Sequence, residues 1–178
     1  MMNNIYLMGF MGSGKTSTGR VLAKKIKAPF ADTDLLIWEL SGMTPGEFIK
    51  KRGCGAWRKA ERSVLRAIAA CEGRVIALGG GIMPVKTLRP LFKKSGTTIY
   101  LKCAEAELLK RLSRGLDKRP LLGGSLETSK RAIARLMKKR RPFYERADFN
   151  VDTTTLTPAQ TAVKIIKKLK RHEKKTSA

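Results

Sequence analysis

The sequence predicts a three-layer α/β/α fold in which a five-stranded parallel sheet lies between two layers of helices. Two observations lead to this class. Short apolar runs alternate with amphipathic segments of helical period along nearly the whole chain, which is typical of parallel strands joined by crossover helices. The length of 178 residues, 42% of them hydrophobic, fits one domain spanning 1–178, because two separate cores would each be small.

The first three predicted strands lie in the amino-terminal half. Residues 5–8 are an apolar run that ends in a glycine-rich turn, and the helical pattern 15–27 follows it. A second short run, 30–33, is closed by acidic residues, and a third, 74–78, stops at Gly79-Gly80-Gly81. Each of these strands is therefore bounded by a turn signal.

Helical segments are predicted between the second and third strands. They extend over 35–71, with breaks at 41–44 and 52–55. The stretch Thr44-Pro45-Gly46-Glu47 combines a capping threonine, proline at the first helical position and glutamate three residues after the cap. This combination is a helix-start signal.

The carboxyl-terminal half continues the alternation of strands and helices. The predicted elements, in chain order, are helix 84–94, strand 97–101, helix 104–113, helix 129–140, strand 149–151 and helix 158–171. Residues 173–178 are expected to form a frayed tail.

Residues 114–128 interrupt this rhythm. They contain Gly115, Pro120, Gly123 and Gly124 and show little amphipathic periodicity. Loops of this length between helices of a compact domain are usually functional or disordered. The sequence therefore predicts a mobile lid at about 113–128.

The net charge of +24 is the most unusual feature of the composition. Such a charge permits binding to nucleic acid or anionic surfaces by counterion release, and it would equally steer anionic substrates toward a cleft. The basic residues are spread along the chain, with local density at 138–141 and 164–175. We expect a solvated surface rich in lysine, and no nucleic-acid binding beyond nonspecific electrostatics.

Several protein classes are disfavoured by the sequence. It contains no apolar run of the roughly 18 residues that a membrane-spanning helix needs, and its start lacks the charged region of a secretory signal. Cys54, Cys71 and Cys103 are odd in number and widely spaced, and the single histidine, His172, lies in a lysine-rich tail. These observations favour reduced thiols in a cytoplasmic protein, and we expect a monomer.

The segment 9–16, Gly-Phe-Met-Gly-Ser-Gly-Lys-Thr, matches the phosphate-loop pattern G-x-x-x-x-G-K-[ST] in full. Its glycines let amide groups approach phosphates closely, and the following helix directs its dipole at the same anion. Lys15 can reach the β- and γ-phosphates, and the Thr16 hydroxyl can coordinate Mg²⁺. Because a strand precedes the motif and a helix follows it, the sequence predicts a P-loop NTPase fold. The residues expected to bind ATP here are Gly12, Ser13, Gly14, Lys15, Thr16 and Ser17.

Two carboxylates, Asp32 and Asp34, follow the second predicted strand. They are expected at the sheet edge where open α/β folds bind ligands. One could face a magnesium shell, while Asp34 could orient an acceptor hydroxyl and take its proton. The alternative is that Asp34 caps the next helix, which is the more common role for an isolated aspartate.

Arginines and glycines elsewhere could bind an anionic acceptor. Arg58 lies in a helical segment, where a solvated side chain is the ordinary reading, but a fixed guanidinium can hold a carboxylate through two hydrogen bonds. Arg119 falls within the predicted lid, and Arg140 and Arg141 end a helix. The turn Gly79-Gly80-Gly81 exposes amides and leaves room for a ligand.

Taken in order, these motifs resemble those of the shikimate kinase family over about residues 4–169. They are GFMGSGKTSTGR at 9–20, DTD at 32–34, WRKAE at 57–61, LGGG at 78–81, RPLL at 119–122 and RRPFYERA at 140–147. The segment from Val151 to Pro158 is similar to the family's adenine-side segment. Two departures are Trp57, where phenylalanine is commoner, and the high basicity.

The resemblance implies a kinase that transfers the ATP γ-phosphoryl group to the 3-hydroxyl of shikimate, giving shikimate 3-phosphate and ADP. This step belongs to chorismate and aromatic amino acid biosynthesis in the cytoplasm. The resemblance also implies substrate-binding helices at about 33–61 and Mg²⁺ as the cofactor. A related kinase of gluconate or nucleotides, or a nucleic-acid-binding ATPase, remains the alternative; the basic stretches lack the interleaved aromatics of a stacking platform.

Residue roles follow from the same resemblance. Asp34 would bind the shikimate ring hydroxyls as the catalytic carboxylate, and Gly80 or Gly81 would donate an amide. The substrate carboxylate would be held by Arg58 and Arg140, with Arg141 as the alternative to Arg140. The remaining implied roles are Thr16 and Asp32 for the metal, Arg119 with Lys15 for the transferred phosphate, and Arg111 and Pro158 for the adenine.

Overall fold

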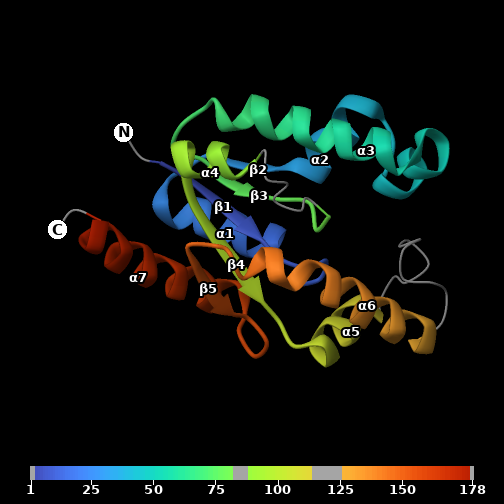
Figure 1. Ribbon diagram of the computed structural model, residues 1–178. Coiled ribbons are helices and arrows are strands. Elements are labelled where there is room, and N and C mark those ends of the chain that lie inside the picture. The colour runs from blue at the N-terminus through green and yellow to red at the C-terminus, as the bar shows by residue number, and fades with distance from the viewer. Residues whose placement is uncertain (1–2, 82–87, 114–125, 177–178) are drawn as a thin grey trace.

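A computed structural model describes residues 3–81, 88–113 and 126–176 (Figure 1). Five parallel strands form one sheet in the order β2-β3-β1-β4-β5. In the centre of this sheet Ile5 pairs with Val75 on one side and with Thr97 on the other. All the predicted strands are present: β1 Asn4–Met8, β2 Phe30–Asp32, β3 Val75–Ala77, β4 Gly96–Lys102 and β5 Phe149–Asp152.

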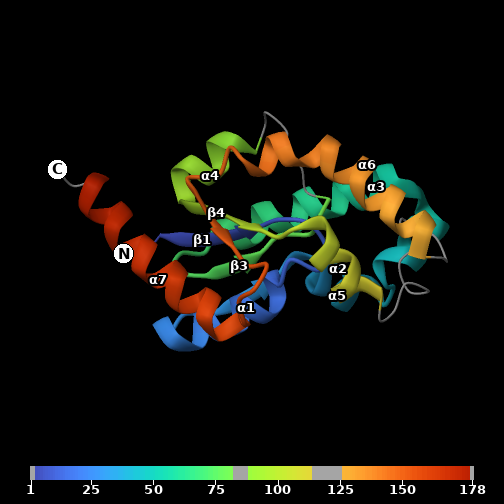
Figure 2. The same ribbon diagram turned by 90° about the horizontal axis from the view of Figure 1, so that it is seen from below.

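Helices cover both faces of the sheet (Figure 2). They are α1 Lys15–Ile26, α2 Thr33–Ser41, α3 Pro45–Ala69, α4 Arg89–Ser95, α5 Glu105–Ser113, α6 Leu126–Tyr144 and α7 Pro158–Thr176. Alternate residues of β1 belong to different cores, because successive side chains of a strand point to opposite faces. Tyr6 and Met8 pack with α3, α4, α5 and α6, while Ile5 and Leu7 pack with α1 and α7. The predicted three-layer architecture is confirmed.

The helix boundaries differ from the predicted ones in several places. The predicted break at 52–55 is a local kink, because α3 continues on both sides of Gly53, whose φ of 82° and ψ of 160° are not helical. Helix α6 begins at Leu126 and not at the predicted residue 129, so residues 126–128 are helical. The expected frayed tail from residue 173 is wrong as far as Thr176, because α7 extends to that residue.

Other predictions concern the ends of elements. The capping box is confirmed: the Glu47 amide donates to the Thr44 hydroxyl at 3.3 Å, and the Thr44 amide donates to the Glu47 carboxylate at 2.7 Å. Trp57 is buried against Phe48, so the core accepts its larger ring. Residues 114–125 of the predicted lid and the start of the predicted helix 84–94 lie outside the described residues. Among the described helices, none is long and apolar enough to cross a membrane.

Candidate active site

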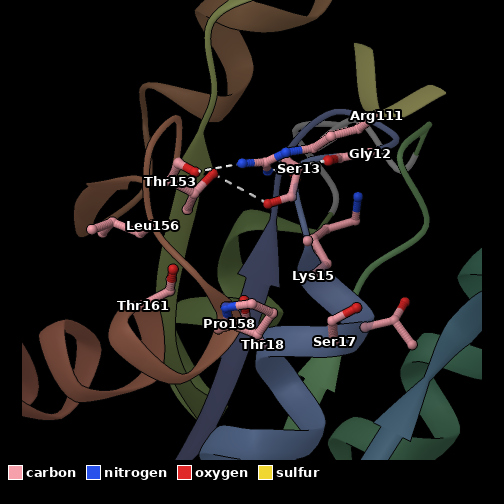
Figure 3. A pocket seen from close by; sticks show the side chains of 12 residues that line it. Gly12, Ser13, Lys15, Ser17, Thr18, Arg111, Thr153, Leu156, Pro158 and Thr161 are labelled. Atoms are coloured by element: carbon pink, nitrogen blue, oxygen red, sulfur yellow. Dashed lines mark hydrogen bonds between the residues drawn. The ribbon is translucent and has the colours of Figure 1, made fainter. Parts of the chain in front are cut away.

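The phosphate loop joins β1 to α1 and forms one wall of a pocket of about 450 Å³ (Figure 3). Gly12 and Gly14 have φ angles of 80° and 90°, a region that other residues rarely adopt. These conformations let the loop turn tightly into the amino terminus of α1. The lining residues beyond the loop and the first turn of α1 are Arg111, Thr153, Leu156, Pro158 and Thr161.

The ammonium group of Lys15 lies over its own loop. Its Nζ donates to the carbonyl oxygens of Gly9 at 3.0 Å and Phe10 at 2.9 Å. Burial lowers the pKa of Lys15 to about 8, while the nearby carboxylates of Asp34 and Asp32 act in the opposite direction. The group is therefore a desolvated cation at the point where a phosphate would enter.

Arg111 is fixed on the other side of the pocket. Its guanidinium donates to the carbonyl oxygens of Thr153 at 2.8 Å and Thr154 at 3.1 Å, and its Nε donates to Glu107 at 2.8 Å. In Figure 3 Arg111 lies above the pocket and Pro158 below it. The structure thus places in one pocket the two residues to which the family resemblance gives the adenine.

Asp32 links the second strand to the phosphate loop. Its Oδ2 accepts a hydrogen bond from the Thr16 hydroxyl at 2.6 Å, and its Oδ1 accepts from the amides of Asp34 and Leu35 at 3.0 and 3.4 Å. Asp32 therefore caps α2, and the alternative that Asp34 is the cap is wrong. A hydroxyl and a carboxylate side by side offer the hard oxygen ligands that Mg²⁺ prefers.

Asp34 lies in the first turn of α2 and faces the end of β3. Its Oδ1 is buried and has no hydrogen-bond partner among the described residues. A side chain at Gly79 would overlap this oxygen, so the glycine leaves room for the carboxylate. Burial raises the pKa of Asp34 to about 7, and the neighbouring carboxylates of Glu61 and Asp32 act in the same direction.

Arg58 projects from α3 toward the glycine turn. Its guanidinium donates to the carboxylate of Glu61, which is only 2% exposed. Burial raises the pKa of Glu61, although Arg58 opposes this shift. A Cβ at Gly81 would overlap the Arg58 guanidinium, so this arginine lies directly against the turn.

Arg140 reaches the same turn from α6. It is 6% exposed, donates from Nη1 to the Gly80 carbonyl oxygen at 2.8 Å, and lies over the Phe10 ring at 5.6 Å. Arg141 is exposed and pairs with Glu145 at 2.7 Å. The structure therefore places Arg140, and not Arg141, beside the glycine turn.

Tyr144 completes the hold on Gly80. Its hydroxyl donates to the Gly80 carbonyl oxygen at 2.6 Å, and its ring stacks on Tyr100. The described chain has no cis peptide bond, and in a trans peptide the carbonyl and the following amide point in opposite directions. Fixing the Gly80 carbonyl therefore turns the Gly81 amide away from Arg140 and Tyr144.

These residues assemble at the carboxyl edge of the sheet, where open α/β folds bind ligands. Sequence reasoning missed three contributors, although each has a signal. Tyr144 follows Arg140 by one helical turn, Glu61 follows Arg58 by nearly one turn, and Thr153 directly follows the last strand. Arg119 lies outside the described residues. Among those that are described, no group of three or more His, Cys, Asp or Glu residues could hold a metal ion.

Comparisons with known proteins agree with this geometry. The family model described as shikimate kinase matches residues 11–170. The shikimate kinase of Thermodesulfovibrio yellowstonii is 39% identical over 170 residues, which are 96% of each chain.

Solved structures give the same result. The structure of shikimate kinase from Acinetobacter baumannii in complex with shikimate has a TM-score of 0.89 and 31% identity, over 97% of this chain and 95% of that one. A gluconokinase from Sinorhizobium meliloti covers 98% of this chain and 95% of its own, but its TM-score of 0.65 and 17% identity indicate a shared fold alone. The chain belongs to the shikimate kinase family.

Proposed function

We propose that this chain transfers the γ-phosphoryl group of ATP to the 3-hydroxyl of shikimate, giving shikimate 3-phosphate and ADP. The observation that carries the proposal is that the phosphate loop and a group of acidic and basic side chains lie together at one edge of the sheet. Lys15 lines the pocket that the phosphate loop forms, and its ammonium interacts electrostatically with the buried carboxylate of Asp34 and with Arg140. Asp34 in turn interacts with Arg58.

The nucleotide occupies the pocket between the phosphate loop and α7. The adenine lies between Arg111 and Pro158, and the phosphates lie over the amides from Gly12 to Ser17. Backbone amides and a helix amino terminus together bind phosphate without further groups. Lys15 exchanges its contacts with the loop carbonyls for contacts with the phosphates, whose negative charge offsets the cost of burying its ammonium.

The shikimate carboxylate binds to Arg58 and Arg140, whose guanidinium groups flank the glycine turn. A planar guanidinium matches a carboxylate through paired hydrogen bonds. The Gly81 amide, oriented by the anchored Gly80 carbonyl, donates to the same ligand. Asp34 accepts hydrogen bonds from the ring hydroxyls, which thus supply the partner that its buried Oδ1 lacks.

In the reaction the 3-hydroxyl oxygen forms a bond to the γ-phosphorus as the bond to the β–γ bridging oxygen breaks. Asp34 orients the hydroxyl and takes its proton, a role that suits a carboxyl group with a pKa near 7. Mg²⁺, when held by Thr16 and by Asp32 through water, supplies neutralisation of phosphate charge. Arg119 and the predicted lid lie outside the described residues, and their proposed contact with the phosphates rests on the sequence.

The proposal is tested by coupled assay of ADP release with ATP, Mg²⁺ and one acceptor at a time. We expect turnover with shikimate and none above background with gluconate or nucleoside monophosphates. Turnover with either of those acceptors and none with shikimate would overturn the assignment.

We also propose that the protein is cytoplasmic and monomeric. Fractionation of the source cells tests its location, and light scattering tests its oligomeric state.

A further inference from the structure

Two helices on one face of the molecule carry basic residues without acidic ones between them. The chain has 38 Lys and Arg residues against 14 Asp and Glu residues. No acidic residue occurs from 15 to 31 or from 153 to 172, and these segments include all of α1 and most of α7. The two helices pack side by side on the same face of the sheet (Figures 1 and 2).

We call this surface the α1/α7 basic face. Besides Arg20, which lies over the Phe30 ring, the exposed cations of the two helices are Lys24, Lys25, Lys164, Lys167, Lys170 and Arg171. The ion pairs found among the described residues lie elsewhere, on or beside α3, α5 and α6. No ion pair among the described residues neutralises these cations, although the Asp152 carboxylate lies close enough to Lys164 for the two charges to interact.

This face is separate from the candidate active site. The starts of α1 and α7 line the nucleotide pocket through residues such as Thr18, Pro158 and Thr161. Both helices then run away from that pocket, and Lys167 lies about 14 Å beyond Pro158 at 1.5 Å of rise per residue. None of the six cations lines the pocket, so binding of ATP does not account for them.

We propose that the α1/α7 basic face binds the phosphodiester backbone of a nucleic acid. The six cations are long and exposed, and they form no ion pair within the part of the chain that the structure describes, which suits a partner with phosphates at regular intervals. Lys164, Lys167 and Arg171 recur at three- and four-residue spacing, so they follow one side of α7. The face offers no exposed aromatic ring among its described residues, so stacking on bases contributes nothing. Binding therefore depends strongly on salt and is independent of base sequence.

An anionic membrane fits this face less well. Helices that lie in a membrane interface insert a row of large apolar side chains, but Ala162, Ile165 and Ile166 of α7 pack into the core instead. Val163, 40% exposed, is the one large apolar side chain that the described part of α7 presents to solvent.

The test uses the full chain and fluorescein-labelled 20-nucleotide probes of single-stranded RNA, single-stranded DNA and duplex DNA. Fluorescence anisotropy gives the dissociation constant at a series of NaCl concentrations. The test variant is K164Q/K167Q/K170Q on α7. The control variant, K93Q/K94Q/K130Q on α4 and α6, removes the same net charge from the opposite layer, where these lysines are equally exposed.

We expect the α7 variant to bind at least 10-fold more weakly at low salt. Its slope of log affinity against log salt should fall by about 2, because each lost phosphate contact contributes about 0.7–0.9. The control variant should stay within about 3-fold of the unmodified chain. The ranking of the three probes then tells which nucleic acid is the better partner. Both variants should retain full turnover with shikimate, which shows that they are folded.

Three results would contradict the proposal. One is equal weakening by the two variants, which would mean that net charge alone drives binding. Another is the absence of probe binding by the unmodified chain at low salt. The third is tighter binding to vesicles containing phosphatidylglycerol than to any of the nucleic acids at the same salt. Because shikimate turnover is measured separately, failure here leaves the proposed function unaffected.

Discussion

The hydroxyl of Tyr144 is one of two donors that hold the Gly80 carbonyl, the other being Arg140. We expect Tyr144→Phe to raise the KM for shikimate about 5-fold, because a hydrogen bond of about 1 kcal/mol that orients the Gly81 amide is lost. The KM for ATP should not change, since Tyr144 does not line the nucleotide pocket. Steady-state kinetics with each substrate varied in turn provides the measurement.

Tyr100→Phe is the matched control for this change. Tyr100 stacks on Tyr144, with ring centroids 5.2 Å apart, so both variants keep the aromatic pair and lose one hydroxyl. Only the Tyr144 hydroxyl contacts the glycine turn. Equal effects of the two variants on the shikimate KM would show that Tyr144 acts by packing alone.

The adjacent arginines offer a second comparison at the residue scale. Arg140→Lys keeps the charge but loses the planar fork, and we expect the shikimate KM to rise at least about 10-fold. Arg141→Lys should change it less than about 2-fold, because Arg141 is exposed and its ion pair with Glu145 is solvated. If the Arg141 variant showed the larger effect, the placement of the substrate carboxylate would be wrong.

The carboxyl group of Asp34 makes stability depend on pH. Its pKa rises from 3.8 to about 7 in the folded chain, so between these values the folded chain holds a proton that the unfolded chain has released. The stabilising contribution is present below pH about 4 and is lost as the pH rises through about 7. Asp34→Asn removes this titration and leaves an uncharged side chain.

We therefore compare the melting temperature of Asp34→Asn with that of the unmodified chain at each pH. The variant's melting temperature minus that of the unmodified chain should be larger at pH 8 than at pH 4.5, by more than about 3 °C. Differential scanning fluorimetry without ATP or shikimate measures this, with the exposed Glu39→Gln as the control. The variant should also lose nearly all turnover, since the proposed proton acceptor is gone. A melting difference independent of pH would show that Asp34 ionises normally in the folded chain.

At the scale of elements, two of the glycines in helix α3 differ in the backbone conformation that they adopt. Gly53 has φ 82° and ψ 160°, while Gly55 is helical, and a Cβ at either position meets open space. Gly53→Ala should destabilise the chain by about 1–3 kcal/mol through backbone strain. Gly55→Ala should stabilise it by about 0.5–1 kcal/mol, because alanine favours the helix.

Urea unfolding of the two variants separates these effects. Because neither methyl group meets a neighbour, packing contributes little, and the sign of each change reports the backbone alone. Stabilisation by Gly53→Ala would mean that α3 is a continuous helix in solution.

The sequence predicts the sheet well because the first three strands are short apolar runs closed by glycine or acidic residues, and the last two follow the same alternation of strands and helices. Helix ends are predicted less well. The helix predicted at 129–140 continues through Pro142 to Tyr144, whose ring stacks on Tyr100 and whose hydroxyl donates to the Gly80 carbonyl oxygen. These tertiary contacts override the local signal. The same limit applies to α7, whose extent to Thr176 is not marked by any capping residue in the sequence.

The candidate site shows a similar division. The phosphate loop is recognisable in the sequence because its chemistry resides in consecutive residues. The contact between Arg140 and Gly80 joins residues far apart in the chain, so the preference for Arg140 over Arg141 came from the family resemblance and not from the residues themselves. The capping role of Asp32 was likewise hidden, because it depends on the chain turning into α2 directly after β2.

For the whole molecule, a net charge of +24 on 178 residues means repulsion within the folded state. Compact chains with large net charge are destabilised by their own field, and salt screens exposed charges over a distance of about 10 Å at 0.1 M. We therefore expect the melting temperature to rise as NaCl increases from about 20 to 300 mM.

The rise should be smaller for K164Q/K167Q/K170Q, which should also melt at a higher temperature than the unmodified chain at low salt. The control K93Q/K94Q/K130Q should gain less at low salt, because its lysines share their layer with the acidic residues of α3, α5 and α6. Equal gains by both variants would show that repulsion is spread evenly, whereas a fall in melting temperature with NaCl would show that ion pairs outweigh it.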